Sequence, residues 1–117
     1  AFGSHQSPVD LQFYDGKQFP QKYRGGAFVV FQGGSGQEML PNGRGGYNVT
    51  FVPFDKSGKP GTPEIFANNF AGPNPSDRNS GKAAFRPSDV AVAPDGSMYV
   101  VDTMKGRLWH IMYDGKN

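Results

Sequence analysis

Glycine and proline interrupt this sequence so often that the longest stretch free of both is nine residues, Ser97 to Lys105. The average α-helix of a globular protein has about 11–12 residues, and both residue types weaken a helix interior. The spacing therefore excludes an all-helical fold. Nine valines and ten phenylalanines against three leucines and two isoleucines favour strands. We predict a turn-rich, all-β protein built from short strands.

Size and charge narrow the classes of protein further. A chain of 117 residues forms one domain at most. The net charge is only +2, and the basic residues are not clustered, which disfavours a nucleic-acid partner. The sequence holds no apolar run long enough for a membrane span. The absence of cysteine excludes disulfides, thiolate metal sites and cysteine nucleophiles, and it is compatible with a periplasmic or secreted protein.

Turn signals divide the chain into seven short segments that we expect to form strands. An apolar segment, an Asp-Gly turn and a second apolar segment make the strongest short-range hairpin signal, and Pro94-Asp95-Gly96 is the clearest case. Hydrophobic alternation or a continuous apolar run marks the segments themselves. The expected strands are Val9–Tyr14, Ala27–Phe31, Tyr47–Phe54, Pro63–Phe70, Ser88–Ala93, Ser97–Asp102 and Gly106–Tyr113.

An internal repeat relates the two ends of the chain. The pattern Pro-x-Asp-apolar-x-apolar begins at Pro8 and again at Pro87, 79 residues later. We align Phe28–Phe31 with Met98–Val101, and Gly46–Val52 with Gly106–Met112, as the second and third strands of each copy. Three matched strands in the same order indicate two copies of one supersecondary unit. Three or four antiparallel strands in about 40–50 residues are typical of a β-propeller blade.

The predicted architecture is therefore all-β, with two blades of a β-propeller in an incomplete ring. Blade one spans about 5–70 and has four strands, a polar loop spans 71–84, and blade two spans about 85–114 and has three strands. Two blades cannot close a ring, and the outer edge of blade two is unpaired, which is a liability. We expect the remaining blades to come from the same polypeptide, from another chain or from self-association. The chain lacks an initiator methionine, and we expect a fragment, a mature product or one piece of a larger polypeptide.

Two polar residues are candidate ligand-binding groups. His5 lies in the loop that leads into the first strand, and Arg86 immediately precedes Pro87. By the repeat, Arg86 occupies the position of Ser7, so equivalent entry loops would bring both groups to one rim, where they could hold an anionic ligand. The alternative for Arg86 is a solvated surface side chain. His110 is expected to be structural, because its strand neighbours are apolar.

Other patterns carry little functional weight. Pro94-Asp95-Gly96 with Asp102 has too few carboxylates for a calcium loop and is expected to be a hairpin turn. The glycine-rich stretch Gly33–Gly36 lacks a following helix, so it does not predict a phosphate site. The alternative is that the glycine backbone, which has no side chains, approaches a flat ligand closely. We find no Ser/His/Asp triad and assign no catalytic residue.

Two stretches resemble a known family. Phe85–Asp102, which contains Arg-Pro-Ser-Asp-Val-Ala-Val-Ala-Pro-Asp-Gly-Ser-Met-Tyr-Val-Val, followed by Gly106–Ile111, resembles the C-terminal end of the glucose/sorbosone dehydrogenase family. His5–Tyr14, with its His-x-Ser-Pro-x-Asp pattern, resembles the preceding blade of the same family. The second segment discriminates best, because the Pro-Asp-Gly-x-Met-Tyr-Val-x-Asp pattern is common to many propellers.

The resemblance implies a six-bladed propeller that uses pyrroloquinoline quinone (PQQ), with Ca²⁺, to oxidise a sugar or another alcohol and passes electrons to an acceptor such as a cytochrome. It implies that His5 and Arg86 contact the cofactor, a tricarboxylate. Related enzymes carry a Trp-Asn pair where this sequence has Ser35-Gly36, and Gln32 stands where histidine is common. That departure, and the family's general base lying upstream of this segment, favour an alternative: a non-catalytic propeller module that acts as a binding or assembly platform.

Overall fold

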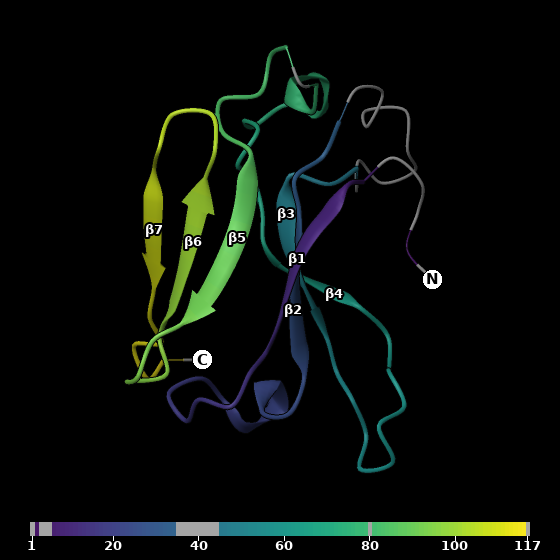
Figure 1. The fold of residues 1–117 in the computed structure, drawn as a ribbon, viewed down its shortest axis with the longest axis vertical. Coiled ribbons are helices and arrows are strands. Elements are labelled where there is room, and N and C mark those ends of the chain that lie inside the picture. The colour runs from purple at the N-terminus through teal and green to yellow at the C-terminus, as the bar shows by residue number, and fades with distance from the viewer. Residues whose placement is uncertain (1, 3–5, 35–44, 80, 117) are drawn as a thin grey trace.

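The chain folds into two antiparallel β-sheets that lie side by side (Figure 1). The computed structural model describes Phe2 and residues 6–34, 45–79 and 81–116. Sheet one has the strand order β1-β2-β3-β4, and sheet two has the order β5-β6-β7. The strand bounds are β1 Pro8–Phe13, β2 Ala27–Phe31, β3 Asn48–Val52, β4 Glu64–Ala67, β5 Pro87–Val92, β6 Met98–Asp102 and β7 Leu108–Ile111.

All seven expected strands form, and their bounds differ from the expected ones by at most three residues; β1 and β5 each begin one residue earlier than expected. The expectation of an all-β protein with a four-stranded and a three-stranded sheet is confirmed. The two sheets do not close into a ring. Short 3₁₀ helices interrupt two loops, η1 Gln21–Tyr23 after β1 and η4 Pro75–Asp77 between the sheets. No helix among the described residues is long and apolar enough to cross a membrane.

The internal repeat appears as the same local irregularity in both sheets. The pairing of β1 with β2 shifts register between Pro8 and Asp10, and the pairing of β5 with β6 shifts between Pro87 and Asp89. After the shift, Asp10 faces Val30 and Asp89 faces Val101. The first strands therefore match as predicted, Pro8 with Pro87.

The register corrects the predicted match of the other strands by one residue. Phe13 faces Ala27, and its counterpart Val92 faces Met98, so Ala27 rather than Phe28 is the counterpart of Met98. In the third strand, Ala27 pairs with Val52 and Met98 with Ile111. A one-residue slip moves every side chain to the opposite face of a sheet. β2 is buried at all five positions, so its sequence has no polar alternation from which the correct phase could be read.

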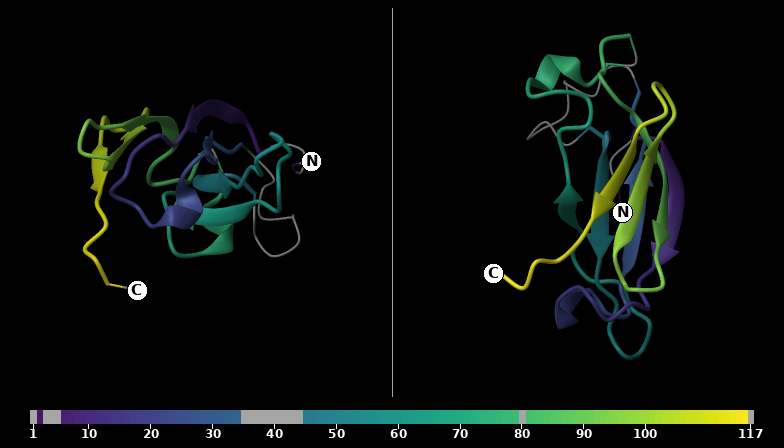
Figure 2. Two further views of the ribbon diagram at one scale, coloured as in Figure 1. Left: turned by 90° about the horizontal axis from the view of Figure 1, so that it is seen from below. Right: turned by 90° about the vertical axis from the view of Figure 1, so that its left-hand side faces the viewer.

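The main core lies between the two sheets. We call the face that each sheet turns toward the other its inner face, and the opposite side its outer face. The strands run along the long axis of the molecule, and β5 contacts β1 and β2 (Figures 1 and 2). The inner faces form one buried cluster, with Phe28, Val30, Val49 and Phe51 from sheet one and Val90, Met98 and Val100 from sheet two.

Tyr14 joins the two sheets at the end of the core where the β5–β6 turn lies. Its hydroxyl donates to the carbonyl of Gly96 (2.8 Å) and accepts from the N–H of Phe19 (2.9 Å), so it joins the turn after β1 to the β5–β6 turn. The ring also stacks on Phe19, with 5.1 Å between centroids. The β5–β6 connection itself is the predicted hairpin turn, closed by the N–H of Gly96 on the carbonyl of Ala93 (2.9 Å).

Candidate functional site

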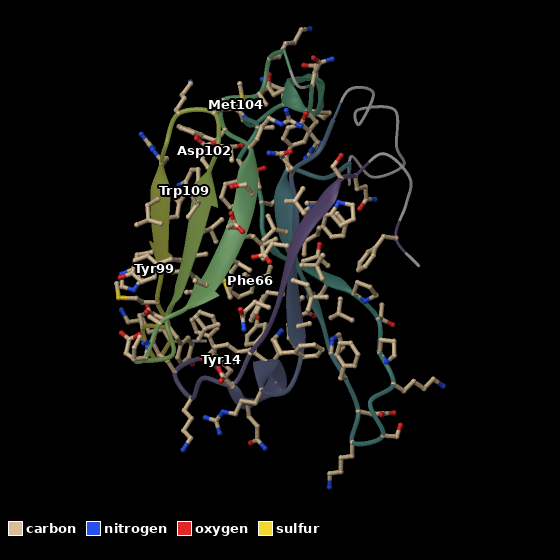
Figure 3. All side chains as sticks on the ribbon, viewed as in Figure 1. Tyr14, Phe66, Tyr99, Asp102, Met104 and Trp109 are labelled. Atoms are coloured by element: carbon tan, nitrogen blue, oxygen red, sulfur yellow. The ribbon has the colours of Figure 1, made fainter. Side chains whose placement is uncertain are left out.

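The candidate site lies at the end of the molecule where β1 and β5 begin and β2 and β6 end. In Figure 3 this end carries Asp102 and Met104, and Tyr14 lies at the opposite end. The two entry loops make equivalent contacts there: the N–H of Gln32 donates to the carbonyl of Ser7 (2.9 Å), and the N–H of Thr103 donates to the carbonyl of Arg86 (3.2 Å). The predicted equivalence of Ser7 and Arg86 is confirmed by these contacts.

Arg86 reaches across from sheet two to the end of β2. Its Nη2 donates to the carbonyl oxygen of Gly33 at 2.5 Å. The guanidinium carbon lies 5.9 Å from the centroid of the Tyr47 ring, within the range of a cation–π contact. Arg86 is half-buried, so it is not the freely solvated side chain that the sequence left as an alternative.

One donor of the Arg86 guanidinium has no partner. Nε is buried and makes no hydrogen bond to any of the residues that the structure describes. No ion pair to a carboxylate neutralises this cation among the described residues, where the single ion pair joins Lys22 to Glu64. A buried donor without an acceptor is costly, and a buried charge normally requires a partner. The guanidinium is therefore suited to donate a hydrogen bond to an anionic oxygen.

Asp102 holds the backbone that carries Arg86. Its Oδ1 accepts from the N–H of Arg86 (2.7 Å), and its Oδ2 accepts from the N–H of Lys105 (2.6 Å). Burial alone would raise the pKa of this carboxyl group, but the backbone N–H donors of Arg86, Lys105 and neighbouring residues outweigh burial and hold the pKa below its usual range. Asp102 thus remains ionised and positions Arg86. The sequence analysis did not predict this role, although Asp102 is the last residue of the Pro-Asp-Gly-x-Met-Tyr-Val-x-Asp pattern.

Close backbone contacts fix the loops around the site. A side chain at Gly46 would place its Cβ 2.7 Å from the Cα of Gly33 and 2.8 Å from the carbonyl oxygen of Gln6. The hydroxyl of Tyr47 donates to the carbonyl of Gly34 (2.9 Å). These contacts bring the end of β2, the start of β3 and the loop before β1 together. The contacts of Gly33 and Tyr47 with Arg86 could not be read from the sequence.

Two further cations contact the ring of Phe85, the residue before Arg86. The Nζ of Lys105 lies 5.2 Å and the guanidinium carbon of Arg107 4.6 Å from the centroid of the Phe85 ring. Phe85 directly precedes Arg86, so three basic residues of sheet two share this end. Such a cluster favours an anionic ligand by long-range attraction as well as by direct contact.

Some of the predicted site residues fall outside the described part of the chain. These residues are His5, Ser35 and Gly36. Their neighbours are described: Gln6 lies beside Gly33, whose N–H donates to its carbonyl at 2.9 Å. Gln32 donates through Nε2 to the Oγ1 of Thr103 at 3.0 Å, so it ties β2 to the β6–β7 turn. Gln6 and Ser7 therefore lie beside the end of β2 that Arg86 contacts.

His110 belongs to a separate cluster on sheet two. Its Nε2 lies 2.7 Å from the Oγ of Ser97, and its ring stacks on Tyr99 with 4.3 Å between centroids. The Oγ of Ser97 also lies 2.5 Å from Oδ1 of Asp95, and Ser97 is fully buried. A buried serine cannot reach a substrate, so this Asp-Ser-His arrangement is a structural network.

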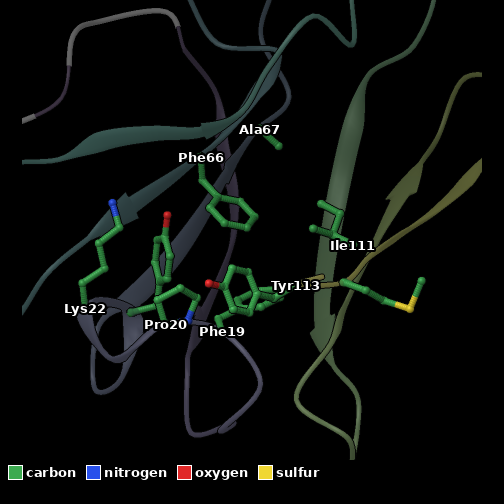
Figure 4. A pocket seen from close by; sticks show the side chains of 9 residues that line it. Phe19, Pro20, Lys22, Phe66, Ala67, Ile111 and Tyr113 are labelled. Carbon is green, nitrogen blue, oxygen red and sulfur yellow. The ribbon is translucent and has the colours of Figure 1, made fainter. Parts of the chain in front are cut away.

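The described residues form no metal site at Arg86. The described residues contain no group of three or more His, Asp or Glu side chains that could hold a metal ion. A hollow of about 500 Å³ lies between β4 and β7, far from the candidate site (Figure 4). Its walls are mainly apolar, and they include Phe66, Ile111 and Tyr113. This hollow offers no charged constellation for the chemistry expected from the sequence.

Comparisons with known proteins give one match. The family model described as TrAA12-like matches residues 1–114. The match covers both sheets and both entry loops. No curated protein and no solved structure matches this chain.

Proposed function

This chain belongs to the TrAA12-like family, and we propose that it forms two blades of a quinoprotein sugar or alcohol dehydrogenase-like β-propeller and contributes to a PQQ site. The proposal combines the resemblance to the glucose/sorbosone dehydrogenase family with the arrangement around Arg86. The remaining blades would come from the same polypeptide or from another chain. A periplasmic or secreted location fits this chemistry.

The guanidinium of Arg86, whose Nε is buried without a partner among the described residues, is the observation that supports the cofactor site most strongly. PQQ carries three carboxylates, and arginine binds carboxylate oxygens through charge-assisted hydrogen bonds. The unpartnered Nε of Arg86 supplies a donor for such an oxygen, and Asp102 holds the arginine backbone in place. His5 would supply a second contact from the equivalent loop of sheet one. The residues present therefore fit an anionic cofactor.

The proposed roles of this chain are binding and orientation. PQQ, when bound, would accept the two electrons of alcohol oxidation and pass them to an acceptor such as a cytochrome. Arg86 and His5 would hold the cofactor, and Lys105 and Arg107 would attract its negative charge. No catalytic base is assigned to this chain. Calcium would require ligands beyond the described residues, because these contain no suitable group.

Equilibrium dialysis of PQQ against the purified protein tests the site. We expect Arg86→Ala to weaken binding about tenfold or more, since hydrogen bonds to charged groups contribute about 1.5–3 kcal/mol. Arg86→Lys should recover only part of the affinity, because lysine lacks the planar donor fork. His5→Ala should also weaken binding. The matched control is Arg24→Ala, which removes an exposed arginine whose Nη2 contacts the carbonyl of Lys17.

The outcomes separate the site from the fold. If Arg86→Ala and His5→Ala both bind PQQ as the unsubstituted protein does, the site assignment is wrong. If Arg24→Ala weakens binding equally, the effect is one of general charge and not of the Arg86 position.

The alternative function is a non-catalytic propeller module that serves as a binding or assembly platform. Exposed apolar residues on both outer faces favour it, among them Leu11 and Phe13 on sheet one and Leu108 on sheet two. Sugar-dependent reduction of a dye, with PQQ and Ca²⁺ added, distinguishes the two functions. Reduction of the dye supports the dehydrogenase, and tight PQQ-independent binding of a partner without dye reduction supports the platform.

A further inference from the structure

Charge is distributed unevenly between the end that carries the candidate site and the rest of the molecule. Basic residues gather at that end in two segments, the loop between β4 and β5 and the turn between β6 and β7 (Figure 1). They are Arg78, Lys82, Arg86, Lys105 and Arg107. Five basic residues against the carboxylates of Asp77 and Asp102 give the described part of this end a net charge of +3. The six basic and seven acidic residues described elsewhere give −1.

Among the described residues, neither carboxylate at this end forms an ion pair with a basic side chain. Oδ2 of Asp77 accepts from the backbone N–H of Asn74 at 2.9 Å. Asp102 accepts from the backbone N–H groups of Arg86 and Lys105. The one ion pair that the structure describes lies outside this end. The positive charge therefore has no local counter-charge, and it attracts negatively charged partners.

An exposed apolar side chain lies among these basic residues. Met104 belongs to the turn between β6 and β7, directly before Lys105, and it is 45% exposed. Figure 3 shows it at the end that carries the candidate site. Lys82, Lys105 and Arg107 are exposed as well. An apolar contact with a polar, solvent-accessible rim is typical of protein–protein interfaces, in which methionine and arginine are enriched. The cationic surface, as we call it, consists of Arg78, Lys82, Met104, Lys105 and Arg107.

We propose that the cationic surface docks the acidic face of a second protein. Lys82, Lys105 and Arg107 attract the carboxylates of the partner from a distance, and Met104 contacts an apolar side chain when the two proteins meet. The identity of the partner rests on the proposed function: it is the protein that accepts the electrons removed from the alcohol. The docking itself rests on charge and exposure alone.

A protein acceptor fits this surface better than a small anion. The basic side chains come from two segments and spread over one end of the molecule, whereas a small anion contacts a single cluster. Complexes between redox partners bury little area, below about 1,200 Å², and charge complementarity speeds their formation. Arg86 lies at the same end, so a partner docked there reaches the proposed cofactor site. Neighbouring blades of a propeller pack against the faces of a sheet, so the ends of its strands stay accessible.

Binding of cytochrome c and of succinylated cytochrome c tests the proposal. The two probes share one fold and one haem, but succinylation replaces the positive charges of the lysines with negative ones. Isothermal titration calorimetry of the chain without PQQ measures both affinities. At about 10 mM salt, where the Debye length is about 30 Å, we expect the succinylated form to bind at least about tenfold more tightly. At about 150 mM salt, where that length is about 8 Å, the difference should shrink.

Charge reversal at each end of the molecule locates the docking surface. Lys105→Glu with Arg107→Glu should weaken binding of the succinylated form about tenfold or more, and Lys82→Glu should weaken it in the same direction. The matched control is Lys56→Glu with Lys59→Glu, which makes the same change in net charge in the exposed connection between β3 and β4, at the opposite end. It should weaken binding less than about threefold, since charges more than a Debye length apart are largely screened. Far-ultraviolet circular dichroism checks that each variant is folded.

Three outcomes overturn the proposal. The two forms of cytochrome c bind equally at low salt. The two double variants weaken binding equally, which indicates an effect of net charge and not of the cationic surface. Heparin, a sulfated polysaccharide, binds the chain while succinylated cytochrome c does not, which makes the partner a polysaccharide. Dialysis against PQQ separates the docking from the proposed function. Loss of docking with intact PQQ binding contradicts the docking alone, and loss of PQQ binding with intact docking contradicts the cofactor site alone.

Discussion

Asp10 and Val90 lie 80 residues apart, and the side chain of one satisfies the backbone of the other. Oδ2 of Asp10 accepts the N–H of Val90 at 2.9 Å, while Oδ1 accepts the N–H of Leu11 at the same distance. Both first strands are sheet edges, and unpaired edge donors are a liability. One carboxylate thus accepts backbone donors from the edge strands of both sheets.

Asp10→Asn should destabilise the protein even though the two side chains are nearly the same size. Asparagine has one acceptor oxygen, and its NH₂ group would face the second backbone donor. We expect a loss of about 1–2 kcal/mol in the free energy of unfolding, because one N–H between the sheets loses its acceptor. Urea denaturation measures this loss. Asp15→Asn, at an exposed turn position, should change stability by less than about 0.5 kcal/mol.

Tyr14→Phe should loosen the end of the molecule opposite the candidate site. The substitution keeps the ring packing on Phe19 but leaves the Gly96 carbonyl and the Phe19 N–H without their partner. We expect a loss of about 2 kcal/mol, which thermal unfolding would detect. Tyr99→Phe is the matched change, because Tyr99 contacts His110 through its ring. Equal losses from both changes would contradict a special role for the Tyr14 hydroxyl.

The sequence was sufficient to predict the strands and the repeat, and it singled out Arg86 as a candidate. Gly and Pro delimit each strand, and Pro8 and Pro87 align two units without any structure. The register of β2 was predicted wrongly by one residue, because a strand buried on both faces has no polar alternation to set its phase. The unpartnered Nε of Arg86 and the carboxylate of Asp102 depend on contacts between loops far apart in the chain. Such packing leaves no local pattern.

Asp102→Asn should make the protein less sensitive to acid. The pKa of Asp102 in the folded protein lies below the value of about 3.9 for an unfolded aspartate, so its ionised form stabilises the fold at neutral pH. This contribution is fully present above about pH 4 and is lost as the pH falls through the folded-state pKa. The variant should lose about 2 kcal/mol at pH 7, since its amide accepts from only one of the two backbone donors.

Denaturation midpoints at pH 7, 4 and 3 test this prediction. The stability difference between the unsubstituted protein and Asp102→Asn should shrink as the pH falls. A difference that stays constant down to pH 3 would show that the charge of Asp102 contributes nothing, and that only its shape and hydrogen bonds matter.

Gly46→Ala and Gly58→Ala together separate backbone strain from close contact near the candidate site. Both glycines have positive φ, +88° at Gly46 and +83° at Gly58, so alanine pays a similar conformational cost of about 1–2 kcal/mol at each. At Gly58 an added Cβ meets nothing within 4 Å, whereas at Gly46 it lies 2.7 Å from the Cα of Gly33 and 2.8 Å from the carbonyl of Gln6. Gly46→Ala should therefore cost about 1–3 kcal/mol more, because two backbone segments would have to separate.

That separation displaces the carbonyl of Gly33, which Arg86 contacts, so Gly46→Ala should also weaken PQQ binding while Gly58→Ala does not. Dialysis of both folded variants against PQQ measures the difference. Equal affinities would show that the loop around Gly33 does not position Arg86 for the cofactor.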